Sequence, residues 1–85
     1  MPSLGVHCHL TRRAFGATYE HVHRWLNEFR RQHRCRRHHE EGIDAVRQLF
    51  GETAAEVARM HIEMDLMEDG WFFVPFPRCE ADYAA

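Results

Sequence analysis

The sequence predicts a small all-α fold, a bundle of three or four helices with an extended apolar strap at the C-terminus. Two observations predict it. Apolar residues recur at intervals of three and four over most of the chain, the spacing that places them on one face of a helix. Glycines and prolines fall between most blocks of this pattern, where helices end. With 85 residues, the chain is long enough for one domain, which we expect over residues 1–85.

The first two helices are expected over residues 3–15 and 18–32. Gly16 ends the first helix, and Thr18 is a suitable N-cap for the second. The apolar face of the first helix consists of Leu4, Cys8, Thr11 and Phe15. The second helix carries its apolar stripe at Val22, Leu26 and Phe29, and the stripe runs on to His33. Both helices are therefore amphipathic.

The third and fourth helices are expected over residues 33–50 and 53–68. Gly51 ends the third helix, and Thr53 with Glu56 forms a capping box that begins the fourth. Neither proline nor glycine separates the second helix from the third, so one long bent helix is an alternative. The inward faces comprise Cys35, His39, Gly42, Ile43, Val46 and Phe50 in the third helix and Val57, Met60, His61 and Met64 in the fourth.

The tail over residues 70–85 contains the run WFFVPFP, in which two prolines and the lack of polar alternation favour an extended apolar strap. Its aromatic side chains are more apolar surface than a lone small domain should expose. We therefore expect the strap to lie over the helices or over another copy of the chain. The residues that would hold such a homodimer, or bind another protein, are Trp71, Phe72, Phe73 and Phe76.

Composition excludes several classes of protein. No apolar run approaches the roughly 18 residues of a membrane span, and the N-terminal residues lack the pattern of a signal peptide, so we expect a cytoplasmic protein. Three cysteines, none in a C-x-x-C pair, are too few for a disulfide framework and are expected to be reduced thiols. The sequence also lacks a glycine-rich phosphate loop, a G-x-S-x-G elbow and a Rossmann fingerprint.

Charge is divided unevenly along the chain. Residues 1–39 hold eight arginines and two glutamates, whereas residues 40–85 hold eleven acidic residues and three arginines. Attraction between these halves can pair helices within the fold, and a basic face for a nucleotide or nucleic acid is the alternative. Arginine's planar guanidinium matches phosphate well. The candidate anion-binding residues are Arg30, Arg31, Arg34, Arg36 and Arg37.

Eight histidines in this short chain need an explanation, because an unpaired buried imidazole costs about 1–3 kcal/mol. His39 and His61 lie near the centres of the inward faces of the third and fourth helices. Asp65 follows His61 by four residues and projects from the same side of the helix. The pattern predicts a cluster at the bundle centre, drawn from all four helices: His7, His23, His39 and His61, with Asp65 in support and His38 as a further ligand.

Neutral imidazoles and a carboxylate suit zinc, iron, manganese or nickel, so the cluster predicts a divalent transition-metal site. The spacing matches no zinc-finger or H-E-x-x-H motif, and a network of interhelical hydrogen bonds is the alternative. A metal-bound water at an open coordination position could act in hydrolysis, with Glu41 as the candidate base. A different class of function is a non-enzymatic interaction module that uses the arginines or the aromatic strap.

The sequence also contains a series of short motifs spread along the chain. It reads V-H-x-W from position 22, R-H-H-x-E-G-I from position 37, F-G from position 50 and H-I-x-x-D-L from position 61. In these motifs nearly the whole chain resembles a family of small, uncharacterised, histidine-rich helical proteins of bacteria and phages. The resemblance implies that one shared group of residues acts together: His7, His23, His33, His38, His39, Glu41, His61 and Asp65.

Overall fold

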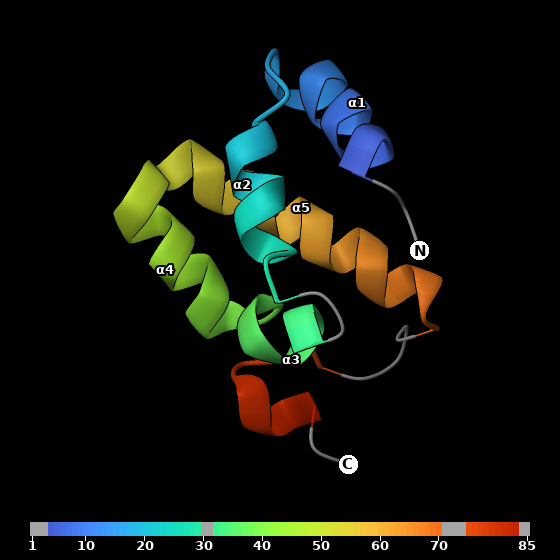
Figure 1. Ribbon diagram of the computed structural model, residues 1–85, viewed down its shortest axis with the longest axis vertical. Coiled ribbons are helices and arrows are strands. Elements are labelled where there is room, and N and C mark those ends of the chain that lie inside the picture. Colours follow the sequence, from blue (N-terminus) through green and yellow to red (C-terminus); the bar gives the residue numbers. More distant parts are fainter. Residues whose placement is uncertain (1–3, 30–31, 71–74, 84–85) are drawn as a thin grey trace.

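The computed structural model describes residues 4–29, 32–70 and 75–83, and this part of the chain is helical and contains no strand. The elements are α1 (Leu4–Phe15), α2 (Glu20–Leu26), α3 (His33–Arg37), α4 (Glu40–Phe50), α5 (Glu52–Glu68) and the short 3-10 helix η2 (Glu80–Tyr83). In Figure 1, α2 crosses the middle of the molecule, with α1, α4 and α5 around it and η2 beside α3. The prediction of a small all-α bundle is confirmed.

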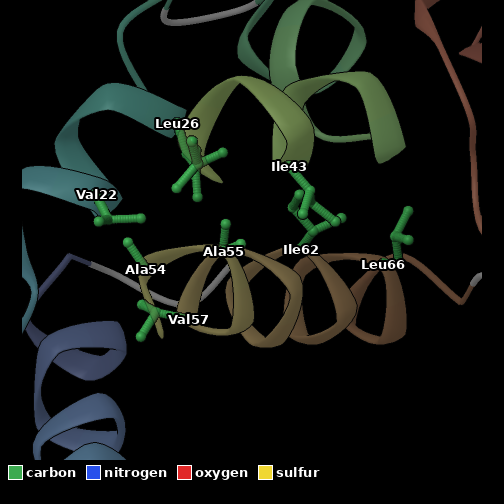
Figure 2. Close-up of a cluster of buried hydrophobic side chains, with 10 residues drawn as sticks. Val22, Leu26, Ile43, Ala54, Ala55, Val57, Ile62 and Leu66 are labelled. Carbon is green, nitrogen blue, oxygen red and sulfur yellow. The ribbon is translucent and has the colours of Figure 1, made fainter. Parts of the chain in front are cut away.

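The apolar core lies where α2 and α4 meet α5. Figure 2 shows Val22 and Leu26 of α2 and Ile43 of α4 directed at α5. Three of the core residues on α5 are alanines, and small side chains allow helices to approach closely. The core comprises Val22, Leu26, Ile43, Val46, Ala54, Ala55, Val57, Ala58, Ile62 and Leu66. It is a modest core, so the fold depends on further interactions.

Helix α1 is held differently from the other long helices. Its two buried residues are His7 and Thr11, which are both polar. The apolar residues beside them, among them Leu4 and Phe15, are only half-buried. Thr11 was expected on the inward face and is there, but the centre of that face is a histidine and a hydroxyl rather than aliphatic carbon. Polar contacts therefore carry much of the attachment of α1 to the bundle.

The second predicted helix is shorter than expected. Tyr19 adopts a left-handed backbone conformation with φ of 50°, so the helix starts at Glu20 and the predicted N-cap at Thr18 is wrong. It ends at Leu26, where the Asn27 N–H donates to the carbonyls of His23 and Arg24. The alternative of one long helix running from here into the next is also wrong. The left-handed residue Tyr19 at one end and the turn that follows Leu26 at the other limit this helix, although the apolar stripe continues beyond it.

The third predicted helix is broken at His38 and His39, which separate α3 from α4. The N–H of Gly42 donates to the Nδ1 atom of His39 over 3.0 Å, so His39 is the N-cap of α4 and not a residue within a helix. Gly42 lies so close to the previous helix that an added Cβ would be 1.9 Å from the Arg37 carbonyl oxygen. Only glycine fits this turn, and the periodicity of the sequence does not reveal it.

The C-terminal segment packs against the start of α4. The N–H groups of Glu40 and Glu41 each donate over 3.0 Å to a carbonyl, those of Pro77 and Arg78 respectively. These bonds satisfy donors that the first turn of a helix leaves without partners. The Tyr83 hydroxyl, in η2, donates to the carbonyl oxygen of His38. The expectation of a tail that is extended throughout is therefore wrong at its end.

The predicted strap is only partly within the described residues. Phe76 is half-buried against the core, with the Arg59 guanidinium carbon 4.8 Å from the centre of its ring. Trp71, Phe72 and Phe73 lie outside the described residues. Among the helices that are described, none combines the length and the apolar character needed to cross a bilayer.

Candidate metal centre

The described residues include a second, polar core made chiefly of histidines. Eight polar or charged side chains are buried, and six of them are imidazoles. The two remaining histidines of the chain, His9 and His21, are exposed. The buried set consists of His7, Thr11, His23, His33, His38, His39, His61 and Asp65. Histidine is seldom buried in such numbers without partners for its ring nitrogens.

Three of these imidazoles meet from three different helices. His7 of α1, His23 of α2 and His61 of α5 are each at most 1 % exposed. One ring nitrogen of each lies within 4.8 Å of a ring nitrogen of each of the others. The rings of His7 and His61 stack with their centres 3.8 Å apart. The Nδ1 atoms of His23 and His61 face each other at 2.7 Å.

The tautomer of His23 follows from its contact with Thr11. The Thr11 hydroxyl donates its only proton to the carbonyl oxygen of His7 over 2.6 Å. Its oxygen also lies 2.8 Å from Nε2 of His23, so it must accept a hydrogen bond from that nitrogen. A neutral His23 therefore carries its proton on Nε2 and turns the bare lone pair of Nδ1 toward His61. Burial, reinforced by the neighbouring His61 and His7, lowers the pKa of His23 to about 3, which keeps it neutral.

Asp65, one helical turn after His61 on α5, orients two of the three rings. Its Oδ1 atom lies 3.2 Å from Nε2 of His7, and its Oδ2 atom lies 3.3 Å from Nε2 of His61. Burial alone would raise the pKa of Asp65, but hydrogen bonds from His61 and His7 outweigh it and hold that pKa well below its usual range. The side chain is thus a carboxylate, and it favours tautomers in which His7 and His61 carry their protons on Nε2. The Nδ1 atom of His7 then carries a lone pair, and this atom has no hydrogen-bond partner among the described residues.

Hydrogen bonds between neutral rings cannot satisfy all these contacts at once. If Nδ1 of His61 donates to His23, the bare Nε2 of His61 faces the Asp65 carboxylate. If Nε2 of His61 donates to Asp65 instead, two Nδ1 lone pairs face each other at 2.7 Å. Protonating His61 would resolve the conflict, but burial lowers the pKa of His61 and the carboxylate offsets this only in part. A metal cation between the two Nδ1 atoms would also remove the conflict, because it would accept both lone pairs while Nε2 of His61 donates to Asp65.

A second group lies on the other side of the same carboxylate. His33 at the start of α3, His38 in the turn after α3, and Asp65 on α5 each offer one ligand atom, and these atoms all lie within 4.8 Å of one another. The Nδ1 atom of His38 is 3.4 Å from Oδ2 of Asp65. The buried histidine and aspartate groups of this chain can therefore hold a metal ion.

Two of the predicted site residues lie in neither group. His39 is 4 % exposed, but its Nδ1 atom accepts the cap hydrogen bond from Gly42. Its expected place beside His23 and His61 is wrong because the chain bends there and turns the ring toward α4. Glu41 is exposed in the first turn of α4. This exposed position does not support the prediction that Glu41 acts as a base toward a buried metal-bound water.

The predicted anion-binding arginines are partly occupied by contacts within the fold. Arg37 donates to the carbonyl of Trp25 over 2.8 Å, and its guanidinium carbon lies 3.8 Å from the centre of the Trp25 ring. It also donates to Glu28 over 3.2 Å, and Arg36 lies 3.4 Å from Glu80. Arg30, Arg31 and the side chain of Arg34 lie outside what the structure describes. Binding of an anion by this group stays a prediction.

The sequence motifs gave Thr11 no place in the site, although they put it on the inward face of the first helix. His33 was named as a site residue only by the family resemblance. A signal for Thr11 was present, because His7 and Thr11 are four residues apart, as are His61 and Asp65. In each pair a histidine and an oxygen side chain share one face of a helix. His33 was assigned to the apolar stripe of a helix that in fact ends earlier, so its role was not visible.

A protein-family model matches most of the chain. Residues 3–71 match a family described as a domain of unknown function, DUF6915. The chain belongs to the DUF6915 family. Every member of both histidine and aspartate groups falls within the matched segment of this DUF6915 protein. No curated protein and no solved structure gives a significant match.

Proposed function

We propose that this DUF6915 protein binds a divalent transition-metal ion through the Nδ1 atoms of His7, His23 and His61, and that the ion is structural. The observation that carries the proposal is the conflict of lone pairs at His61, which faces His23 on one side and the Asp65 carboxylate on the other. A metal ion accepts the lone pairs of all three rings and leaves each Nε2–H to an oxygen acceptor.

The donor chemistry fits this assignment. Three neutral imidazoles suit zinc, and also iron and nickel, while manganese would favour more oxygen donors. In tetrahedral coordination at ordinary zinc–nitrogen distances, the ligand nitrogens stand about 3.3 Å apart. The His23 and His61 nitrogens, now 2.7 Å apart, would need to separate slightly, and the stacked rings of His7 and His61 would need to tilt.

A structural role follows from where the ligands lie. The three rings come from α1, α2 and α5, and α1 has no buried aliphatic side chain to hold it. An ion that links these helices would supply attachment that the small apolar core does not. The ligands are at most 1 % exposed, which favours a closed structural site over a hydrolytic one that must admit substrate. Hydrolysis with Glu41 as base receives no support, because Glu41 is exposed and belongs to neither group.

The test is metal content and its effect on stability. Protein purified without a metal-affinity tag should contain bound transition metal, and chelator should lower its melting temperature. At a free Zn²⁺ concentration of 100 times Kd, binding adds about 2.7 kcal/mol, a shift on the order of 10 °C for a domain of this size. The double variant His7→Gln/His23→Gln should lose this ion and the stabilisation that it provides.

The exposed histidines provide a matched control. His9 and His21 lie on the same two helices as His7 and His23. The variant His9→Gln/His21→Gln removes the same number of imidazoles from the same helices and should keep the ion and the thermal shift. Equal metal loss in both double variants would mean that surface histidines bind the metal, and the proposal would be wrong.

A further inference from the structure

The second group of buried ligands is not used by the proposed structural ion, apart from the orienting contacts of Asp65. His38 and Asp65 are at most 1 % exposed and His33 is 9 % exposed. They come from three separate places in the chain, namely α3, the turn after it and α5. Two imidazoles and one carboxylate are a common ligand set for divalent first-row metals.

The orientation of His38 supports a ligand role. Its Nε2 atom lies 3.2 Å from the carbonyl oxygen of Leu26. A carbonyl can only accept a hydrogen bond, so this nitrogen carries a proton, and when the ring is neutral its Nδ1 atom holds the lone pair. That lone pair lies 3.4 Å from Oδ2 of Asp65. A nitrogen lone pair and a carboxylate oxygen that meet inside a protein are well placed to share a cation.

The turn that carries His38 is fixed from both sides. Gly42 permits the close approach of α4 to the carbonyl of Arg37, and His39 caps α4. The Tyr83 hydroxyl donates to the carbonyl oxygen of His38. A ligand held in place before the metal arrives loses little conformational freedom on binding. The C-terminal segment thus contacts both this turn and α3.

We propose that the protein holds a second divalent metal ion, bound by His33, His38 and Asp65, so that the buried core is a two-metal centre. Asp65 joins the two sites: it binds the second ion through Oδ2 and orients His7 and His61 for the first. The second site rests on the proposed function only through this shared carboxylate. Its own histidines take no part in the first site.

The stoichiometry of binding tests this. Tag-free protein is stripped with chelator and dialysed against buffered Zn²⁺, and the bound metal is measured by mass spectrometry. The wild-type chain should bind two ions, His33→Gln/His38→Gln should bind one, and the control His9→Gln/His21→Gln should bind two. The double variant His7→Gln/His23→Gln should also bind one ion, at the second site.

The outcomes separate the two proposals. If the wild-type chain binds one ion that is lost with His7 and His23 but kept without His33 and His38, the second site is wrong and the first stands. If the single ion is lost with His33 and His38 instead, the first site is wrong and the second stands. Two ions that persist in His33→Gln/His38→Gln would also overturn the second site. If a double variant does not fold, the single variants His38→Gln and His7→Gln are counted in its place and should each bind one ion.

Discussion

The hydroxyl of Thr11 on α1 lies 2.8 Å from Nε2 of His23 on α2, and this contact determines which nitrogen His23 turns toward His61. Because Thr11 donates its own proton to the carbonyl of His7, it can serve His23 only as an acceptor. A hydroxyl on one helix therefore helps to set the tautomer of a proposed ligand on another, together with the backbone hydrogen bond of His23 to Thr18. Groups that orient a ligand in this way commonly matter nearly as much as the ligand itself.

Replacement of Thr11 by valine tests this relationship. Thr11→Val keeps the branched shape but removes the acceptor for His23, so the affinity for Zn²⁺ should fall by about 10- to 100-fold. Thr11→Ser keeps the hydroxyl and should bind nearly as tightly as the wild type. Competition with a chromophoric chelator measures both affinities. If the valine variant binds as tightly as the serine variant, the hydroxyl does not orient His23 for a metal.

Removal of metal should loosen α1 more than the other helices. Its buried residues are His7 and Thr11, whereas α4 and α5 retain their apolar packing in the absence of metal. Hydrogen exchange after chelation should therefore speed up at least about tenfold for the amides of α1 relative to those of α5. Exchange that rises equally in all helices would show that the ion does not specifically attach α1.

The metal-free protein should lose stability as the pH falls below neutrality. The unfolded chain protonates His23 near its ordinary pKa of 6.5, whereas in the folded state its pKa is about 3. Between these values the unfolded state binds more protons, so stability falls by about 1.4 kcal/mol per pH unit from this residue alone. The lowered pKa of Asp65 acts in the same direction at still lower pH, because its carboxylate is stabilised in the folded state.

Urea unfolding in the presence of chelator at pH 7, 6, 5 and 4 measures this dependence. The exposed His21 serves as the comparison, because His21→Gln should leave the slope unchanged. His23→Gln should instead flatten it. A free energy of unfolding that is constant from pH 6.5 to pH 4 would contradict the burial of a neutral His23.

Gly42 should not tolerate a side chain. A Cβ atom there would be 1.9 Å from the carbonyl oxygen of Arg37, so Gly42→Ala must push α4 away from α3. We expect a loss of about 3 kcal/mol, as for severe overpacking, and a drop in melting temperature on the order of 10 °C. The matched control is Gln48→Ala on the exposed face of α4, which should change stability little. Equal stability of both variants would show that the turn is not constrained as described.

Much of the fold could be read from local patterns. Helical periodicity and the glycine at position 51 placed the α4–α5 pair, and the i, i+4 spacing of His61 and Asp65 put them on one inward face, as the structure has them. The break at His38 and His39 could not be read in this way. It depends on contact between Gly42 and the carbonyl of Arg37, which only the three-dimensional packing creates.

The number and spacing of histidines were sufficient to indicate that imidazoles would be buried, since a helix face follows from residue order alone. Which of them meet depends on how separate helices cross, and this brought His33 to Asp65 and directed His39 away into a cap. Helical periodicity is a property of neighbouring residues, whereas the distance between two rings from different helices is set by the packing of the whole chain. For that reason most helix faces could be predicted from the sequence, whereas the break at His38 and His39 and the grouping of His33 with His38 and Asp65 could not.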